Sequence, residues 1–365
     1  MWKLLERVTT YYHSEGLLRL IGGIWLILGQ NVHSACFTLA QLWDDICERE
    51  YSLRTIFVSY YRGFKPKTYC WLDIQNNDPN CYAADVGEYA GLNSGYEDVT
   101  GNDYAFYRLS KRYTDAIPDL YGTIENGGFV PVDTQENSIL DLVRTHRIIV
   151  LKPMTGSQGD GFYRIEYNGS GFLINDELRS GQEVQDTIEK LTNYTVTEYI
   201  TQHDYCSQIY ERTPNTIRIL TIIDPRTHES VVLRACHRFG SSDSYPTDNW
   251  SRSGYAAPVD VDTGRIKEII LLNEIGQRFY SEQHPETGSQ VTGITVPYWE
   301  KSKDVVRRLA DLHRPAPIIG WDVIITEDGP IIIEANTPGD HLIQFEKGLY
   351  EDARFRRLMN TQATT

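Results

Sequence analysis

The chain has 365 residues, of which 41% are hydrophobic and 23% charged, as in a soluble protein with more than one core. Its formal net charge of −15 argues against a nucleic-acid-binding surface, although an acidic protein can hold a local basic pocket for phosphates. The six cysteines include no Cys-x-x-Cys pair, which disfavours a zinc site and favours reduced thiols in the cytoplasm. The oligomeric state stays open.

The chain to about residue 60 carries apolar residues at helical spacing and predicts helices. Within it, residues 17–28 are strongly apolar, but the run is short for a membrane span and contains Arg19. It also begins late for a signal peptide, after Glu6 and Glu15. We expect a cytoplasmic protein in which this run packs into a core or, alternatively, contacts a membrane surface or a partner.

A loop-rich stretch follows, and Asn102 with Asp103 predicts the start of a helix over 104–113. From about residue 148 the pattern changes to strands joined by short turns. We expect strands at 148–151, 162–167, 171–174, 194–200, 217–223 and 230–236, and helices at 180–191 and 305–312. A helical region followed by mixed strands and helices predicts an α+β fold.

Near the C-terminus, two β-branched runs, 323–325 and 331–333, flank turn-forming residues and predict a hairpin. A hairpin centred on residue 328 places Asp322 opposite Glu334, and strand alternation puts Asn336 on the same face. Opposed carboxylates repel, so this arrangement suits a cation. Such oxygen ligands are typical of Mg²⁺ held jointly with substrate phosphates. An exposed polar face on an edge hairpin is the structural alternative.

A second motif begins where the apolar strand at 148–151 ends in Lys152 and enters a glycine-rich turn. The turn contains Gly156, Ser157, Gln158, Gly159, Asp160 and Gly161. Glycines let backbone N–H groups approach phosphate oxygens, and a lysine adds a positive charge. The glycine order fits neither the P-loop nor the Rossmann fingerprint. Taken alone, the turn can also be an ordinary glycine-rich hairpin.

The strand lysine, the glycine-rich turn, a later Glu-Tyr-Ile segment and the terminal Asp…Glu-x-Asn pattern resemble the ATP-grasp superfamily over residues 100–345. Segments 102–109, 119–122 and 320–339 are similar to its sugar-transfer-associated family. The resemblance implies an ATP-grasp fold, in which two α+β subdomains grip ATP, behind a mainly helical N-terminal extension.

The resemblance also implies three parts of the chain. Residues 1–115 would form the helical N-terminal region and the segment before the ATP-grasp unit. Residues 116–200 would form the N-terminal subdomain with its glycine-rich flap. Residues 201–365 would form the C-terminal subdomain with the magnesium site.

For the nucleotide, the resemblance implies that Lys152 contacts the ATP phosphates and that the flap closes over them. The linker ending in Tyr199 would grip adenine, with backbone groups of Glu198 and Ile200 reading its edge. Asp204 would bind the ribose.

For the chemistry, the resemblance implies that Arg218 stabilises the transferred phosphoryl group, helped by Arg234 or Arg238. Asp322, Glu334 and Asn336 would hold Mg²⁺, with Glu334 bridging two ions. Asn249 and Ser253 would lie in a substrate-facing loop.

The chain departs from the family pattern at Tyr104, where many ATP-grasp enzymes have a second phosphate-binding lysine after an aspartate. Arg108 and Lys111, which follow on the same predicted helix, are candidates to replace it.

The function implied is an ATP- and Mg²⁺-dependent ligase that joins a carboxylate to an amine through an acylphosphate. Its substrates would be small or glycan-linked, such as precursors of cell-surface glycans or glycolipids. Two alternatives stay open: a phosphotransferase acting on a hydroxyl, and a nucleotide-binding scaffold without activity.

Overall fold

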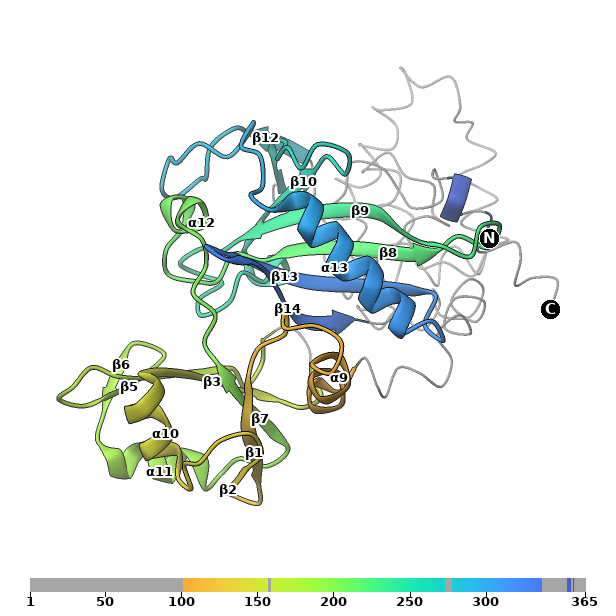
Figure 1. Ribbon diagram of the computed structural model, residues 1–365. Helices are drawn as coiled ribbons and strands as arrows, with labels where there is room; N and C mark the ends of the chain where they lie inside the picture. Colours follow the sequence, from red (N-terminus) through yellow and green to blue (C-terminus); the bar gives the residue numbers. More distant parts are fainter. Residues whose placement is uncertain (1–100, 157–158, 273–277, 337–352, 356, 358–365) are drawn as a thin grey trace, which may run out of the picture.

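The computed structural model describes residues 101–156, 159–272, 278–336, 353–355 and 357. The predicted N-terminal extension, including the apolar run at 17–28, lies outside the described residues, as do Ser157 and Gln158 of the flap. Within the described part, two antiparallel sheets form the two lobes in Figure 1. Among the helices described there, none is long and apolar enough to cross a membrane.

The first sheet has the strand order β2-β1-β7-β3-β4-β5-β6. Its strands are β1 (Leu120–Glu125), β2 (Gly128–Pro131), β3 (Ile148–Pro153), β4 (Tyr163–Tyr167), β5 (Phe172–Ile174), β6 (Glu177–Arg179) and β7 (Tyr194–Glu198). Helices α10 (Ile139–His146) and α11 (Gly181–Ile188) pack on one face. Leu142 and Val184 from these helices share a core with Ile149, Leu151 and Val196. Strand alternation therefore turns Lys152 toward the opposite face.

The second sheet has the order β12-β11-β10-β9-β8-β13-β14. Its strands are β8 (Ile217–Ile223), β9 (Ser230–Phe239), β10 (Tyr255–Val259), β11 (Ile269–Leu272), β12 (Arg278–Ser281), β13 (Ile318–Thr326) and β14 (Gly329–Asn336). Helix α13 (Trp299–Leu312) crosses one face, as Figure 1 shows. Val306 and Leu309 of α13 share a core with Ile219, Val323 and Ile332. The other face of β8 and β13 carries Arg218 and Asp322 beside buried apolar residues such as Leu220 and Ile324.

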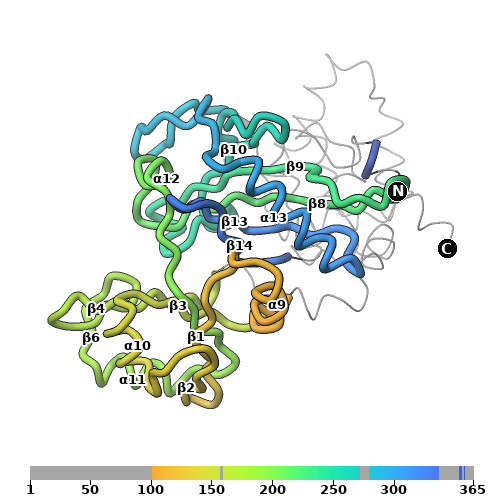
Figure 2. The backbone as a smooth tube through the Cα atoms, in the orientation of Figure 1, coloured from red at the N-terminus to blue at the C-terminus, as the bar shows by residue number. Residues whose placement is uncertain are grey.

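Helix α9 (Asp103–Ser110) joins the two lobes. Asn102 caps it by accepting a hydrogen bond from the backbone N–H of Ala105 at 3.0 Å. Phe106 and Tyr107 are buried in the core of the second sheet together with Trp321. A helix grouped by sequence with the N-terminal region thus packs on the C-terminal sheet. The chain passes between the lobes again after β7 and enters α12 (Asp204–Ile209), as Figure 2 shows.

All the elements predicted from residue 102 onward are present, most of them with different ends. Helix α13 begins at Trp299, six residues before the predicted start at 305. The prediction was late because residues 300–304 are all polar and interrupt the apolar repeat. The hairpin β1–β2, helix α10, helix α12 and the strands β6 and β10–β12 were not predicted. These elements are short or lie at sheet edges, where the sequence pattern is weak.

Candidate functional site

The polar face of the second sheet gathers arginines and acids from four strands. Antiparallel pairing places Arg218 beside Asp322 across β8 and β13, and beside Cys236 across β8 and β9. Directly paired residues project from the same face, so Arg238, two positions beyond Cys236, lies there as well. Asp322 pairs on its other side with Glu334. The sheet face opposite α13 therefore carries both the arginines and the carboxylates of the predicted site.

The β13–β14 hairpin opposes the two predicted carboxylates through an irregular register. At the turn, Thr326 pairs with Gly329, so the loop holds only residues 327–328. A register shift then pairs Asp322 with Glu334. The opposition predicted from the sequence is confirmed, but the symmetric turn centred on residue 328 is wrong. A tighter turn and one extra residue further along β14 give the same pair.

That extra residue is Ile333, which has no partner in the ladder between the pairs Val323–Ile332 and Asp322–Glu334. Its carbonyl oxygen instead accepts hydrogen bonds from the Lys152 Nζ at 2.9 Å and from the Tyr107 hydroxyl at 2.6 Å. The bulge thereby connects β14 to the first sheet and to α9.

Lys152 is further held by a 2.8 Å ion pair with Asp103 at the start of α9. Burial alone would lower the pKa of the Lys152 amine, but Asp103, Tyr107 and Glu334 raise it above its usual value. The amine is therefore a fixed positive charge. It lies between the two lobes. The family resemblance predicts that this amine contacts the ATP phosphates.

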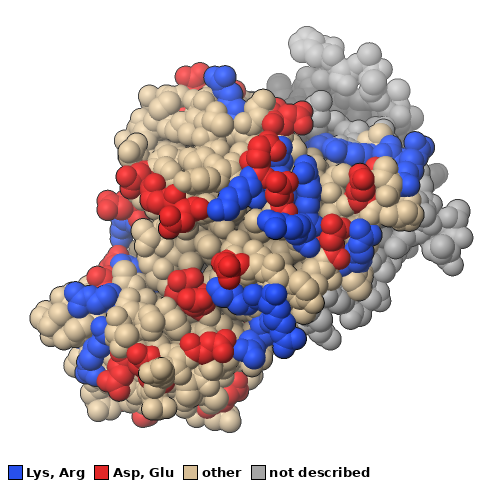
Figure 3. Space-filling model, in the orientation of Figure 1, with Lys and Arg blue, Asp and Glu red and all other residues tan. Residues whose placement is uncertain are grey.

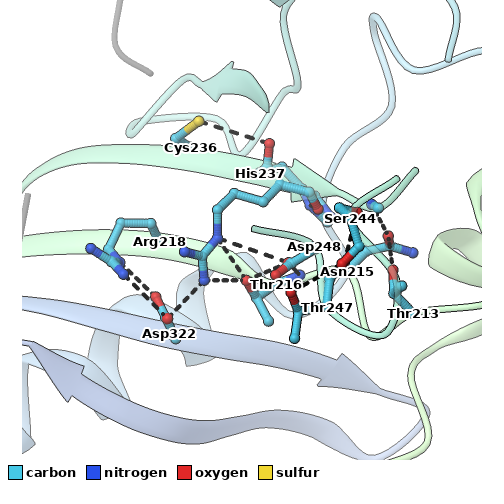
Figure 4. A network of polar contacts seen from close by, with 12 residues as sticks. Thr213, Asn215, Thr216, Arg218, Cys236, His237, Ser244, Thr247, Asp248 and Asp322 are labelled. Carbon is cyan, nitrogen blue, oxygen red and sulfur yellow. Dashed lines mark hydrogen bonds and ion pairs between the residues drawn. The ribbon is translucent and has the colours of Figure 1, made fainter. Parts of the chain in front are cut away.

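Asp322 is almost fully buried and is held by two arginines. Its Oδ1 accepts from Arg218 Nε at 2.5 Å and its Oδ2 from Arg238 Nη2 at 2.7 Å. Figure 4 shows the first of these contacts. Burial would raise the pKa of Asp322, but Arg218 and Arg238 hold it well below its usual range. Both oxygens are thus already engaged, which the sequence did not predict for a metal ligand.

Glu334 is the open carboxylate of the site, because it makes no hydrogen bond or ion pair with any described residue. Burial, followed by the charges of Asp322 and Asp103, raises its pKa to about 7. Two positions further on β14, the Nδ2 of Asn336 is buried without a hydrogen-bond partner among the described residues. A buried N–H donor without a partner points to a missing acceptor, such as a phosphate oxygen.

The described residues hold no cage of three or more acidic, histidine or cysteine side chains. The donor set nevertheless fits a divalent cation shared with phosphates, since Mg²⁺ uses few protein carboxylates and completes its shell with other oxygens. Glu334 and Asn336 would hold it, with Asp322 beside them. A bound cation would also relieve the repulsion that raises the pKa of Glu334.

At the predicted adenine linker, the Glu198 backbone N–H donates to the Asp119 carbonyl at 3.0 Å, and the Glu198 side chain accepts from the Asp119 N–H at 2.9 Å. The N–H of Glu198 is thus engaged within the protein. The ring of Tyr199 lies under the guanidinium of Arg164, 5.3 Å from its centroid. Asp204 starts α12, where its N–H donates to Glu327 at 2.9 Å.

The described flap residues contact the loop that precedes β10. Gly159 and Gly161 have φ angles of +74° and +73°, which glycine adopts without strain. A side chain at Gly159 would collide with Thr247, 2.6 Å away. Asp160 forms an ion pair with Arg252 in the same loop. Gly156 is exposed.

Arg108 and Lys111 are the two candidates to replace the missing second phosphate-binding lysine. They line a cleft of about 570 Å³ beside Tyr121 and His146, which belong to the helix-covered side of the first sheet. Arg108 pairs with Asp133 at 3.0 Å, and Lys111 pairs with Asp119 at 2.8 Å. Figure 3 shows basic and acidic side chains side by side over α9. Both side chains are thus paired with acids, and neither makes a contact with Lys152 among the described residues.

Among the remaining predicted residues, Arg234 donates through Nη1 to the Leu233 carbonyl at 2.9 Å, and it is Arg238 that bonds to Asp322. Asn249 and Ser253 flank the short 3-10 helix η4 (Trp250–Arg252). The sequence reading missed Tyr107, Thr216 and Asp248 as parts of the site. They have no motif of their own, and only the fold brings them to the charged residues.

Two antiparallel sheets that meet at a half-buried lysine, with an acidic hairpin facing that lysine, define the ATP-grasp class of folds. A family model described as sugar-transfer associated ATP-grasp matches residues 95–356, and the chain belongs to this family. None of the curated proteins searched matches the sequence.

Among solved structures, the chain is similar to ligases of several kinds. The ATP-grasp ligase PsnB, complexed with a phosphomimetic variant of its minimal precursor, Mg and ADP, is 13% identical at a TM-score of 0.38, over 75% of this chain and 60% of PsnB. N5-carboxyaminoimidazole ribonucleotide synthetase (PurK) in its ADP complex is 15% identical at a TM-score of 0.39, over 72% and 52%. D-alanine–D-alanine ligase from Bacillus anthracis is 12% identical at a TM-score of 0.39, over 75% and 68%. The chain thus spans less than two thirds of the length of the first two.

Proposed function

We propose that the protein is an ATP- and Mg²⁺-dependent ligase that activates a carboxylate as an acylphosphate and joins it to an amine. The family assignment supports ATP as the substrate. The observation that carries the proposal is the Glu334 carboxylate. It is open, its pKa is raised to about 7, and it lies on the same face as two buried arginines.

The protein residues would act by position and charge. A carboxylate oxygen of the acceptor attacks the γ-phosphorus of ATP, and the bond to the ADP oxygen breaks. Lys152 is held where it can neutralise phosphate oxygens, since its other contacts fix the amine between the lobes. Arg218 and Arg238, positioned by Asp322, would stabilise charge on the transferred group.

In the second step, an amine attacks the acyl carbon and phosphate leaves, so no nucleophilic side chain is needed. Mg²⁺, when bound, would neutralise phosphate oxygens as a Lewis acid. Glu334 and Asn336 would hold it through their side-chain oxygens. Asp204 and the linker at Tyr199 remain our candidates for holding the nucleoside.

The test is the Glu334→Gln variant in an assay of ADP release. Carboxylates and amines are supplied together and separately, and the family description directs the panel to sugar-linked compounds. We expect wild-type ADP release to require both substrates, and E334Q to lower the rate by about 100-fold because a metal ligand is lost. The control is Asp328→Asn, which changes an exposed acid at the turn of the same hairpin and should keep the wild-type rate.

Full activity of E334Q would show that the metal assignment is wrong. A phosphorylated product formed without any amine would identify a phosphotransferase instead. Nucleotide binding with no turnover across the whole panel would identify a scaffold.

A further inference from the structure

Arg238 is held on the side away from Asp322 by a second buried acid. Its Nε and Nη2 donate to the Thr216 hydroxyl oxygen at 2.9 and 2.6 Å. The same hydroxyl lies 2.7 Å from Asp248 Oδ2, which also accepts from the Thr216 backbone N–H at 2.6 Å. Figure 4 shows Thr216 and Asp248 beside Asp322 and Arg218.

The direction of this chain of hydrogen bonds is fixed by chemistry. An arginine can only donate and an ionised carboxylate can only accept. A hydroxyl has one proton, so Thr216 must donate it to Asp248 and accept from Arg238 through its lone pairs. Asp248 therefore orients Thr216, and Thr216 orients Arg238.

Burial makes this arrangement firm. Asp248, Thr216, Arg238 and Asp322 are each at most 8% exposed. Together with Arg218 they include two arginines and two aspartates, so their formal charges balance. In a buried site, charge-assisted hydrogen bonds are strong and an unbalanced charge is costly.

Asp248 is itself fixed by its loop. The Ser244 hydroxyl donates to the Thr247 carbonyl at 2.7 Å, and the Gly254 N–H closes the loop on the Asn249 carbonyl at 3.0 Å. At the start of the loop, the Gly240 N–H donates to the buried Asn215 at 3.0 Å. The acid is thus presented to Thr216 by a braced segment.

The Nη1 of Arg238 makes no hydrogen bond to a described residue. Nε and Nη2 carry all the side-chain hydrogen bonds of Arg238 to described residues. We propose that Asp248 and Thr216 are positioning residues, which hold Arg238 so that its Nη1 donates to the γ-phosphoryl group of ATP. This inference rests on the proposed function.

The experiment compares ATP and ADP, because the two ligands differ by the γ-phosphoryl group. Dissociation constants are measured by titration calorimetry with Mg²⁺ present, for wild type, Asp248→Asn, Thr216→Val and Thr216→Ser. We expect D248N and T216V to weaken ATP binding about 5- to 10-fold, since an oriented charge-assisted contact is lost, while ADP binding changes less than 2-fold. T216S keeps the hydroxyl and should retain the wild-type ATP preference.

Asp224→Asn is the matched control. Asp224 lies just beyond the other end of β8, is 6% exposed, and also accepts from a backbone N–H and an arginine, Arg226 and Arg357. D224N should lower the melting temperature without changing the ATP-to-ADP ratio. If T216V and D248N weaken both nucleotides equally, or neither, or no more selectively than D224N, the inference is overturned while the proposed function stands. If wild type binds neither nucleotide, both fall.

Discussion

Lys152 is the residue whose contacts tie the lobes together most directly. Its amine bonds to Asp103 of α9 and to the Ile333 carbonyl of β14, although it belongs to β3 of the other sheet. These contacts give Lys152 a structural role in holding the lobes together, whereas the sequence predicted only a role in phosphate binding. The two roles can be separated by experiment.

We expect Lys152→Met to lower the free energy of unfolding by about 3 kcal/mol, because it leaves a buried carboxylate without its partner. The same variant should also lose most ATP affinity. In the double variant D103N/K152M the orphaned charge is gone, so stability should largely recover while ATP affinity does not. Urea unfolding and ATP titration measure the two effects. A double variant as unstable as K152M would contradict this account.

For individual residues, the sequence predicted that Asp322 lies opposite Glu334, because the prediction needs only the number of residues between each of them and the turn. It did not predict that Asp322 would be enclosed by Arg218 and Arg238. Nor did it predict Asp103 as the partner of Lys152, since the two lie on different elements. Contacts between elements depend on how the sheets pack, and a single sequence carries little signal for that.

Among the elements, α9 is short but carries both Asp103 and Tyr107 to the site. Helices of this length depend on their caps and on packing. Asn102 caps α9, and Ser180 caps α11 through a capping box with Glu183. Only the first helix contacts the candidate site.

We therefore expect Asn102→Ala and Ser180→Ala each to lower the free energy of unfolding by about 1 kcal/mol. Only N102A should also weaken ATP binding, because fraying of α9 loosens Asp103 against Lys152. Denaturant unfolding and calorimetry of both variants provide the comparison. Equal loss of ATP affinity in the two would show that α9 has no special part in the site.

The sequence predicted strands well where apolar alternation is strong, as in β8, which begins and ends as expected at 217 and 223. It missed α10 and the β1–β2 hairpin. It also placed the start of α13 six residues late, because the polar residues 300–304 interrupt the apolar repeat after Trp299.

Among the described residues, buried histidines contribute to the loss of stability in acid. His237 is fully buried, and burial lowers its pKa to about 3. Burial lowers the pKa of His313 to about 4 as well. In the unfolded chain these side chains titrate near pH 6.5.

The direction in which stability changes with pH follows from proton uptake by the unfolded chain. Below about pH 6.5 the unfolded chain binds protons that the folded His237 does not, so stability falls as the pH drops toward 3. Between about pH 6.5 and the folded pKa, each such histidine lowers the free energy of unfolding by about 1.4 kcal/mol for each pH unit of acidification. Above about pH 6.5 it has no such effect. Unfolding at pH 7.5, 6 and 5 should show a shallower loss for His237→Gln than for wild type. His228→Asn, at an exposed turn, should follow wild type, and an equal slope for H237Q would refute the assignment.

The single extra residue in β14 also has a consequence for how this hairpin can change in evolution. Ile332 and Ala335 both lie in the core, three positions apart, which a regular strand with its period of two cannot achieve. The bulge at Ile333 reverses the alternation, and only this reversal turns Glu334 toward the site. The length of the segment from the turn to Glu334 is therefore constrained more strictly than the identity of its apolar residues. Substitutions there should be tolerated, whereas one inserted residue would exchange the acidic and the apolar faces.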